Sequence, residues 1–278
     1  MMSVHTFHRT WGNTALTLDC TFTIKRRVAA LMLFAWLLLL PLAASGDEIL
    51  MVADEWCPYN CAAGADAPGY MVELARYAFE TQGHSVSYKV VPWPRAIEGT
   101  RSGAYDVIIG AGKEEVPDFI FPDETAGLAV HSFYVTRTSD WNYTGLDALH
   151  EMTLGVIKDY SYGTLFNDYI KPNEGDPKRL SIVSGDNALP RIIRMLMHGR
   201  IDAMIEDKNV MDYQFMTRAD QHLIRAAGVA CEEQLFIAFS PANKESAQYT
   251  RLLDNAIREM KASGALTTLL NKYGIKSW

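Results

Sequence analysis

The chain has few cysteines, no excess of positive charge and no low-complexity segment. Four cysteines in 278 residues are too few for a small disulfide-rich scaffold. A total of 26 Lys and Arg against 33 Asp and Glu gives a formal net charge of −7, which argues against a protein dedicated to binding nucleic acid. A hydrophobic share of 49% excludes disordered and collagen-like chains. The composition indicates an ordinary folded protein with one large domain or two smaller ones.

One apolar run stands near the N-terminus. Residues 25–27 form a basic cluster, and Val28–Ala44 contains 17 residues without a charge. A short apolar run between a basic cluster and small residues is typical of an export signal. We expect a signal peptide over residues 1–46, cleaved after Ala44 or Gly46, and a mature chain in the periplasm. Because the run is close to the shortest length that spans a membrane, an uncleaved anchor is the alternative.

The predicted mature chain is more acidic than the whole. Residues 1–46 contain four Lys or Arg and one Asp, so their removal leaves 22 basic and 32 acidic side chains, a net charge of −10. This charge disfavours nucleic acid and anionic membranes as partners. A site for an anion would therefore have to be local, formed by a helix start and one or two basic side chains.

Three cysteines remain after the predicted signal, which contains Cys20. Disulfides persist in an exported protein. Cys57 and Cys61 lie close together in a loop with Pro and Gly, so a Cys57–Cys61 disulfide is the first choice and a Cys61–Cys231 pair is the alternative. No His stands near these cysteines at the spacing of zinc ligands, and the seven His residues show no paired spacing. We expect no metal and no cofactor.

The mature sequence alternates strand patterns and helix patterns twice. Such an alternation predicts an α/β protein with a parallel sheet and covering helices. The predicted elements of the first round are strands at 49–53, 85–91 and 105–109 and helices at 71–79 and 96–101. Those of the second round are strands at 152–157, 181–183 and 201–205 and helices at 161–169, 186–197 (capped by Asp186) and 209–215. A strand at 235–239 and a pair of amphipathic helices over 252–270 follow.

Seven motifs in this order resemble one family. They are Trp56-Cys57-Pro58-Tyr59 with Gly69–Leu74, then Pro92–Ile97, Ser102–Ile109, Phe119–Asp123, Gly155–Gly163, Gly199–Ala203, and Lys261–Leu266 with Lys272–Gly274. Together they resemble the extracellular solute-binding proteins of family 3, the periplasmic receptors of polar amino-acid ABC importers. The resemblance covers nearly all of the predicted mature chain.

The resemblance implies a two-lobed periplasmic-binding-protein fold of type II. Its mixed, mostly parallel sheets carry helices on both faces, and two crossover strands join the lobes. The crossings are expected near Phe133–Thr138 and Phe236–Ser240. Lobe 1 would comprise 47–135 and 237–278, and lobe 2 would comprise 136–236. The resemblance also implies a monomer that takes a small polar solute, an amino acid or a related compound, and presents it to a membrane permease.

The resemblance also points to ligand-binding residues. Asp207 falls where the family places an acidic ligand contact. The helix start at Ser161 offers free backbone N–H groups for a carboxylate. The alternative interpretation is that Ser161 only caps the helix. Tyr160 and Tyr162 flank Ser161 and could stack on a ligand or hydrogen bond to it. Flat apolar surfaces near the cleft would come from Trp56, Tyr59 and Trp93, of which Trp93 could instead belong to the core.

One element of the family pattern is missing. Amino-acid binders of this family clamp the ligand carboxylate with an arginine in a Thr-x-x-Arg stretch, whereas this chain continues from Gly110 through Gly112 and Lys113 without an arginine. Lys113 or Arg95 could substitute, although a lysine does not reproduce the bidentate geometry of a guanidinium. The alternative for Lys113 is a solvated loop charge. This departure weakens the amino-acid assignment more than the receptor assignment.

The resulting function is a receptor without catalytic residues. The rival is an exported enzyme of the cyclohexadienyl-dehydratase type on the same fold, for which Glu55, Glu206 or Asp207 could act as the acid/base group. A third possibility is a ligand sensor for a membrane receptor.

Overall fold

The computed structural model describes residues 46–185, 187–217 and 221–276. These described residues belong to one compact unit. The predicted export signal with Cys20, and the predicted cap Asp186, lie outside the described residues. No helix in the described part combines the length and the apolar character that a membrane span requires.

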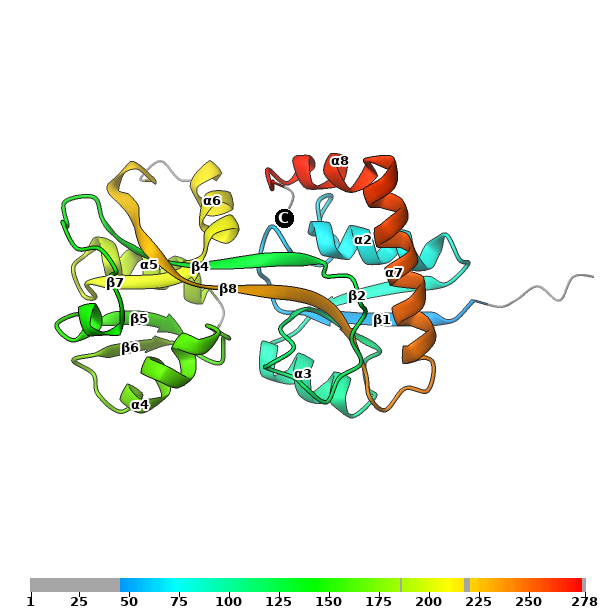
Figure 1. Cartoon of the computed structure of the whole chain (residues 1–278), viewed down its shortest axis with the longest axis horizontal. Helices are drawn as coiled ribbons and strands as arrows, with labels where there is room; N and C mark the ends of the chain where they lie inside the picture. Colours follow the sequence, from blue (N-terminus) through cyan, green and yellow to red (C-terminus); the bar gives the residue numbers. More distant parts are fainter. Residues whose placement is uncertain (1–45, 186, 218–220, 277–278) are drawn as a thin grey trace, which may run out of the picture. The chain divides into compact units, whose positions relative to one another are not determined.

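Eight strands form one mixed sheet in the order β2-β1-β3-β8-β4-β7-β5-β6 (Figure 1). One half of the sheet contains the parallel strands β1 (Glu48–Ala53), β2 (Ser85–Val90) and β3 (Val107–Ala111). The other half contains the parallel strands β5 (Leu154–Ile157), β6 (Leu180–Val183) and β7 (Ala203–Asp207). We call these the first half and the second half, each with the helices packed on it.

Two antiparallel strands connect the halves. β4 (Gly127–Thr136) pairs with β8 (Ile224–Phe239) along its length, from Gly127 opposite Leu235 to Thr136 opposite Ile224. The last residues of β8 also pair with β3, and the middle of β4 pairs with β7. The two strands therefore run side by side from one half into the other, as Figure 1 shows.

Helices cover both faces of the sheet. The first half carries α2 (Tyr70–Glu80), α3 (Trp93–Arg101), α7 (Ser246–Ser263) and α8 (Ala265–Lys272). The second half carries a π-helical segment (Phe166–Ile170) continued by α4 (Lys171–Asn173), then α5 (Ala188–Met197) and α6 (Lys208–Thr217), and short 3-10 turns lie at Leu146–Leu149 and Gln221–Leu223. The predicted α/β fold class is confirmed.

The parallel strands are apolar on both faces because each face is covered. In β1, Ile49 and Met51 belong to the core under α2, α7 and α8, whereas Val52 belongs to the core under α3. In β5, Leu154 contacts one core of the second half and Ile157 the other. This arrangement explains why continuous apolar runs in the sequence marked these strands.

The loop between β1 and α2 folds back on the start of α2. The first helix N–H groups have no partner within a helix. Here the N–H groups of Tyr70 and Met71 donate to the carbonyl oxygens of Pro58 and Tyr59, at 3.1 Å each. The Cys57–Cys61 disulfide lies in the same loop, and Cys231 is a free thiol. The first choice of disulfide is therefore present, and the alternative pairing is not formed.

Gly69 permits this close approach. Its φ of +109° lies in the region that favours glycine, and a Cβ there would lie 2.4 Å from the carbonyl oxygen of Tyr59. Gly64 also has a positive φ of +80°, but a Cβ there would meet nothing within 4 Å. Comparing substitutions at the two glycines therefore distinguishes the cost of backbone strain, present at both, from the cost of a steric clash, present at Gly69 alone.

We expect Gly69→Ala to lower the free energy of unfolding by about 3 kcal/mol or more, because the strain of a positive φ adds to a clash with backbone atoms. Gly64→Ala carries the strain alone and should cost about 1 kcal/mol. Urea unfolding of both variants measures the difference. Equal losses would show that the loop does not need the close approach at Gly69.

Candidate ligand-binding site

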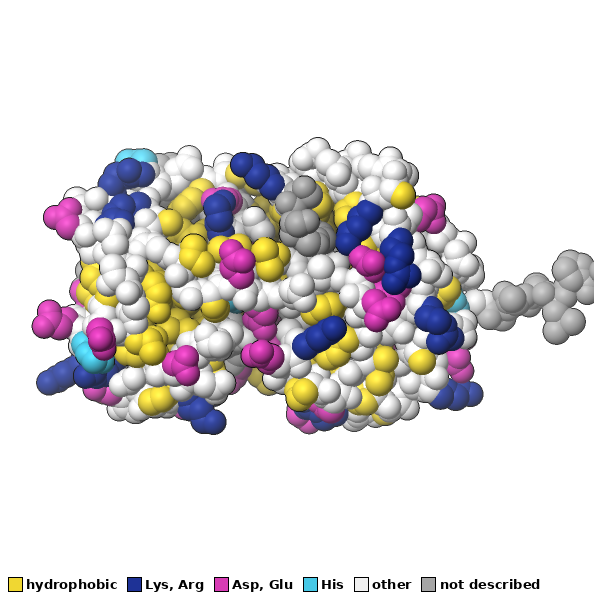
Figure 2. Space-filling view, in the orientation of Figure 1, with side chains coloured by type: hydrophobic (Ala, Val, Ile, Leu, Met, Phe, Trp, Pro, Cys, Tyr) yellow, Lys and Arg dark blue, Asp and Glu magenta, His cyan; other side chains and the backbone are white. Residues whose placement is uncertain are grey.

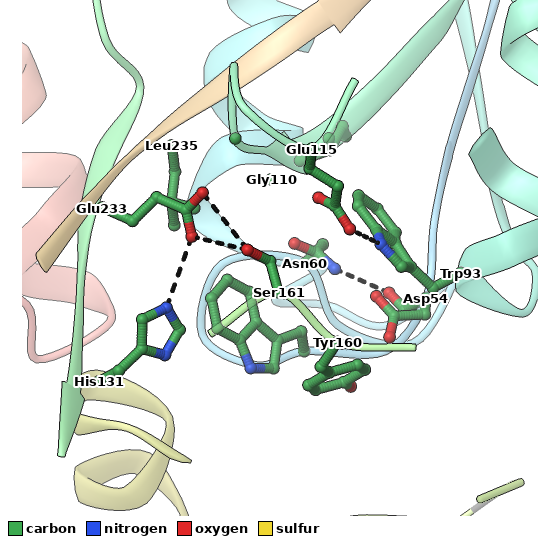
Figure 3. Close-up of a pocket in the computed structure, with 13 residues that line it drawn as sticks. Asp54, Asn60, Trp93, Gly110, Glu115, His131, Tyr160, Ser161, Glu233 and Leu235 are labelled. Atoms are coloured by element: carbon green, nitrogen blue, oxygen red, sulfur yellow. Dashed lines mark hydrogen bonds and ion pairs between the residues drawn. The ribbon is translucent and has the colours of Figure 1, made fainter. Parts of the chain in front are cut away.

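A pocket opens where the two halves meet. Its lining comes from the ends of β1, β3 and β5, from α3, and from the middle of β4 and β8: Asp54, Trp56, Asn60, Trp93, Ile109, Gly110, Gly112, Glu115, His131, Tyr160, Ser161, Glu233 and Leu235 (Figure 3). Loops at the carboxyl ends of parallel strands are the usual ligand site of an open α/β sheet. On the face drawn in Figure 2, acidic side chains gather at this junction.

The pocket is a small inner cavity that adjoins a larger hollow. The inner cavity has a volume of about 40 Å³, more than the about 10–15 Å³ that one water needs. The outer hollow has a volume of about 360 Å³ and shares Glu115, Tyr160, Ser161 and Glu233 with the inner cavity. A small head group fits the inner cavity, with the rest of a ligand in the outer hollow.

Aromatic side chains form the walls of the inner cavity. Trp56 stacks on Tyr59 with ring centroids 4.5 Å apart, and the ring of Tyr160 meets Trp56 edge-on at 6.5 Å. The indole N–H of Trp93 donates to Glu115 Oε1 at 2.7 Å, and that of Trp56 donates to Glu206 Oε1 at 3.1 Å. Both indole donors are therefore already occupied by carboxylates.

Two carboxyl groups in the pocket have strongly raised pKa values. Burial raises the pKa of Asp54 to about 6, although a hydrogen bond with the Tyr160 side chain opposes the shift. Burial raises the pKa of Glu115 to about 7, and the nearby charges of Glu233 and Asp54 raise it further, whereas the hydrogen bond from Trp93 lowers it. Desolvation without a cationic partner is the dominant cause in both cases.

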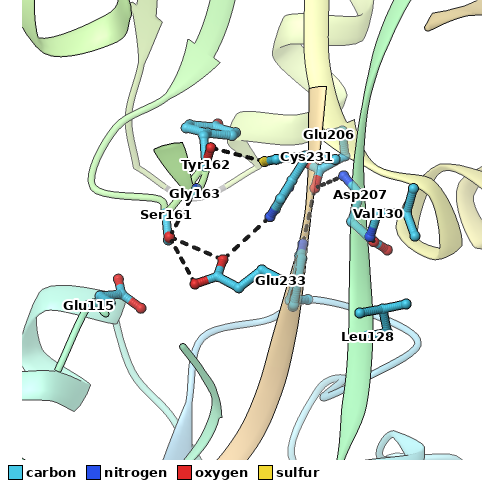
Figure 4. Close-up of polar contacts among 12 residues, drawn as sticks. Glu115, Leu128, Val130, Ser161, Tyr162, Gly163, Glu206, Asp207, Cys231 and Glu233 are labelled. Atoms are coloured by element: carbon cyan, nitrogen blue, oxygen red, sulfur yellow. Dashed lines mark hydrogen bonds and ion pairs between the residues drawn. The ribbon is translucent and has the colours of Figure 1, made fainter. Parts of the chain in front are cut away.

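Glu233 points from β8 toward the loop after β5. The hydroxyl of Ser161 donates to Glu233 Oε2 at 3.2 Å (Figure 4), and His131 Nε2 lies 3.6 Å from the same oxygen (Figure 3). Gly112 makes room for this side chain, because a Cβ at Gly112 would lie 2.0 Å from Glu233 Oε1. The carboxylate therefore fills the space between β8, the loop after β3 and the loop after β5.

Asn60 leaves a hydrogen-bond acceptor unused in the lining. Its side chain is 1% exposed, and its Nδ2 donates to the carbonyl oxygen of Asp54 at 2.7 Å. Its Oδ1 has no hydrogen-bond partner, and it lies 3.4 Å from the position that a Cβ on Gly110 would occupy. Gly110 lines the pocket, and in Figure 3 the side chain of Asn60 lies at the pocket.

Half of the predicted ligand residues line the inner cavity. Trp56, Trp93, Gly112, Tyr160 and Ser161 do so. The helix predicted to start at Ser161 begins at Thr164 instead, since Ser161 and Tyr162 are not helical. Ser161 therefore presents a hydroxyl rather than a helix terminus to the pocket, and this hydroxyl already donates a hydrogen bond to Glu233.

Asp207 lies beneath the pocket rather than in it. Its carboxylate is fully buried and accepts hydrogen bonds from the backbone N–H groups of Val130 at 2.8 Å and Val210 at 3.0 Å, and from the Tyr59 hydroxyl at 3.0 Å. Burial raises the pKa of Asp207, and the hydrogen bonds oppose that shift. The predicted ligand contact is therefore an internal link between β7, β4 and the loop after β1.

The other predicted residues also lie outside the inner cavity. Tyr59 is buried in the core of the first half, and Tyr162 is buried in a core of the second half, with its hydroxyl accepting from the N–H of Ile157. Tyr162 lines the outer hollow but not the inner cavity. Arg95 is exposed, and Lys113 is exposed with its Nζ 4.4 Å from the ring centre of Phe236. Lys113 is therefore a surface charge in this structure, as the alternative interpretation expected, and it does not lie where it could clamp a ligand carboxylate.

Five further polar residues line the inner cavity and were not among the predicted ligand residues: Asp54, Asn60, Glu115, His131 and Glu233. Asp54 directly follows the predicted strand 49–53, and its place at a strand end was a usable signal. His131 and Glu233 lie on parts of β4 and β8 that no sequence pattern marked as strand. The three acids proposed for an enzyme do not line the inner cavity: Glu55 is exposed, and Glu206 and Asp207 are buried.

Comparisons with known proteins identify one family for nearly all of the described residues. The family described as bacterial extracellular solute-binding proteins, family 3, matches residues 49–276. The amino acid ABC transporter substrate-binding protein AbpA from Streptococcus pneumoniae, bound to L-arginine, is similar in structure with 18% identity and a TM-score of 0.65, covering 84% of this chain and 97% of that one. No curated protein matches the chain in sequence.

Two further similar structures differ in their described roles. A histidine kinase sensor domain with similarity to periplasmic binding proteins has 18% identity and a TM-score of 0.66, covering 84% of this chain and 99% of its own. The ancestral amino acid-binding protein AncCDT-1, a precursor of cyclohexadienyl dehydratase, has 17% identity and a TM-score of 0.62, covering 82% and 95%. These likenesses establish the shared fold.

The buried carboxyls predict how stability depends on pH. Burial also raises the pKa of Glu206 to about 7. Because Asp54, Glu115 and Glu206 keep their protons to a higher pH in the folded chain than in the unfolded chain, folding binds protons between about pH 4 and 7. The ligand-free protein should therefore lose stability as the pH rises through this window and level off above it.

Urea unfolding at pH 5 and pH 8 measures this loss. Glu115→Gln removes one titrating group while keeping an oxygen for Trp93, so the difference between the two pH values should shrink by about 1–3 kcal/mol. Glu232→Gln, at an exposed neighbour of Glu233 on β8, should keep the full difference. An unaltered pH dependence in Glu115→Gln would contradict the assignment.

Proposed function

Since the chain belongs to the bacterial extracellular solute-binding proteins of family 3, we propose that it is a periplasmic receptor that captures a small polar solute, an amino acid or a related compound, and delivers it to an ABC importer. The observation that carries the proposal is the pocket, whose lining is divided between the two halves of the sheet. A ligand there contacts both halves at once, so its binding energy favours the closed arrangement.

The proposed lobes are 47–135 with 237–278, and 136–236. Direct contacts already link them beside the pocket. Trp56 donates to Glu206, and Tyr59 donates to Asp207 while accepting from Asn209 Nδ2 at 2.9 Å. β4 and β8 would carry the hinge, because these two strands continue from one half into the other. In this proposal export depends on residues 1–46, and the mature receptor acts as a monomer with a membrane permease as its partner.

An enzyme is the second candidate, and one observation favours it. Burial raises the pKa of Glu115, in a pocket wall, to about 7, so a large share of this carboxyl keeps its proton near neutral pH, which is the state that a general acid requires. The similar structure described as a precursor of cyclohexadienyl dehydratase belongs to the same fold. Turnover of prephenate or arogenate by the purified protein would support this candidate. A sensor role uses the same binding step and differs in the downstream partner.

A thermal-shift screen of amino acids, polyamines and organic acids tests the receptor. At a ligand concentration of 100 times Kd, binding should add about 2.7 kcal/mol to the free energy of unfolding. Tyr160→Ala removes part of the aromatic wall and should weaken binding about tenfold or more in calorimetry. Arg95→Ala, on α3 but outside the pocket, should bind as the parent does. Saturable binding that survives Tyr160→Ala unchanged would place the site elsewhere.

A further inference from the structure

The charge of the pocket lining is entirely of one sign, apart from a histidine. Asp54, Glu115 and Glu233 line the inner cavity, and no Lys or Arg does so among the residues that the structure describes. His131 is already beside a carboxylate, since its Nε2 lies 3.6 Å from Glu233. The outer hollow is also acidic: besides Glu115 and Glu233 its lining includes Glu114, Asp159 and Glu174 against Lys158.

The buried polar atoms of the lining that have no hydrogen-bond partner are Asn60 Oδ1 and the two ring nitrogens of His131. Three side-chain donors at the pocket are already used by carboxylates: Trp93 donates to Glu115, Ser161 to Glu233, and Trp56 to Glu206. The Oδ1 atom of Asn60 is buried in the lining without a partner. A buried acceptor without a partner is costly, so it marks the position of a donor that the ligand supplies. A ligand that carries an N–H group would supply the donor that Asn60 Oδ1 lacks.

The shape of the site selects an organic cation. Within the described residues, no group of three His, Cys, Asp or Glu is arranged to hold a metal ion. The inner cavity has room for one small head group. Its walls include the rings of Trp56, Trp93 and Tyr160. Aromatic faces together with carboxylates stabilise ammonium and guanidinium groups, through cation–π attraction and charge-assisted hydrogen bonds.

A ligand carboxylate has no favourable place. The helix start expected at Ser161 is displaced to Thr164, and the carboxylate of Glu233 accepts from the Ser161 hydroxyl. Arg95 and Lys113, the basic residues predicted to clamp a carboxylate, line neither the inner cavity nor the outer hollow. Among the described residues, Lys158 is the one basic side chain that lines the outer hollow, against five acidic ones. A carboxylate on the ligand would therefore meet mostly like charges, which is unfavourable in a buried site.

We propose that the pocket binds an organic ammonium or guanidinium compound that carries no carboxylate. Its cationic head lies in the inner cavity between Asp54, Glu115 and Glu233, with an N–H bond donated to Asn60 Oδ1, and its remaining atoms extend into the outer hollow. This inference rests on the proposed receptor function and narrows its solute class from amino acids to amines and guanidines.

Isothermal titration calorimetry with matched pairs tests the proposal. Agmatine differs from arginine, and cadaverine from lysine, by the carboxylate alone. The purified protein should bind agmatine or cadaverine about tenfold or more tightly than the corresponding amino acid. Glutamate and neutral glutamine serve as the anionic and uncharged probes, and neither should bind measurably.

Two substitutions place the cation in the pocket. Glu115→Gln and Glu233→Gln each remove one negative charge and keep the side-chain volume, so each should weaken binding of the preferred cation about tenfold or more. Glu232→Gln, the exposed neighbour on β8 that lines neither cavity, should bind as the parent does. Circular dichroism melting curves of the variants confirm that the fold persists.

The outcomes distinguish the two levels of the proposal. Preferential binding of the cation that depends on Glu115 and Glu233 supports both. Saturable binding of arginine, lysine, glutamate or glutamine at equal or higher affinity than the amines overturns the cation assignment and leaves the receptor function standing. Binding of a cation that is unaffected by both substitutions also overturns the assignment. Absence of saturable binding by every probe and by every compound of the thermal-shift panel contradicts the receptor function itself.

Discussion

The antiparallel pairing of β4 with β8 joins the two halves of the sheet and holds them at the pocket. These strands pair from Gly127 opposite Leu235 to Thr136 opposite Ile224. They continue from the first half of the sheet into the second, where β4 also pairs with β7. The same strands carry His131 and Glu233 into the pocket. The pairing of these two strands therefore sets both the spacing of the halves and the place of two site residues.

The buried carboxyl groups of the pocket lower the stability of the ligand-free fold when they ionise. Burial without a cationic partner raises the pKa values of Asp54 and Glu115, so ionisation of these groups costs stability in the ligand-free protein. Buried carboxylates of this kind are commonly found at functional sites, because a bound partner offsets their desolvation. The fold tolerates the cost through large cores on both faces of each half. The protein thus holds an unfavourable charge arrangement ready for a cation.

Sequence patterns predicted the elements that depend on local periodicity. The parallel strands β1, β3 and β5 were recognisable because burial on both faces leaves a continuous apolar run. Periodicity did not mark β4 or the first part of β8, since they cross the pocket and carry polar residues such as His131, Glu232 and Glu233. The family resemblance alone implied a crossing near Phe133–Thr138, at the end of β4. Register shifts also interrupt their pairing near His131 and Ser132. A strand whose surroundings change along its length shows no regular hydrophobic periodicity in the sequence, so periodicity does not identify it.

The sequence by itself determined the family resemblance, the fold class, and the aromatic part of the pocket from Trp56, Trp93 and Tyr160. Tertiary structure alone decided the charged part. Asp207 follows the predicted strand 201–205 and Glu233 precedes the predicted strand 235–239. Yet Asp207 is enclosed by donors from Val130, Val210 and Tyr59, whereas Glu233 accepts from Ser161 in the cavity. Apart from Val210, these partners lie far along the chain, so the role of each carboxylate depends on contacts that local sequence does not encode.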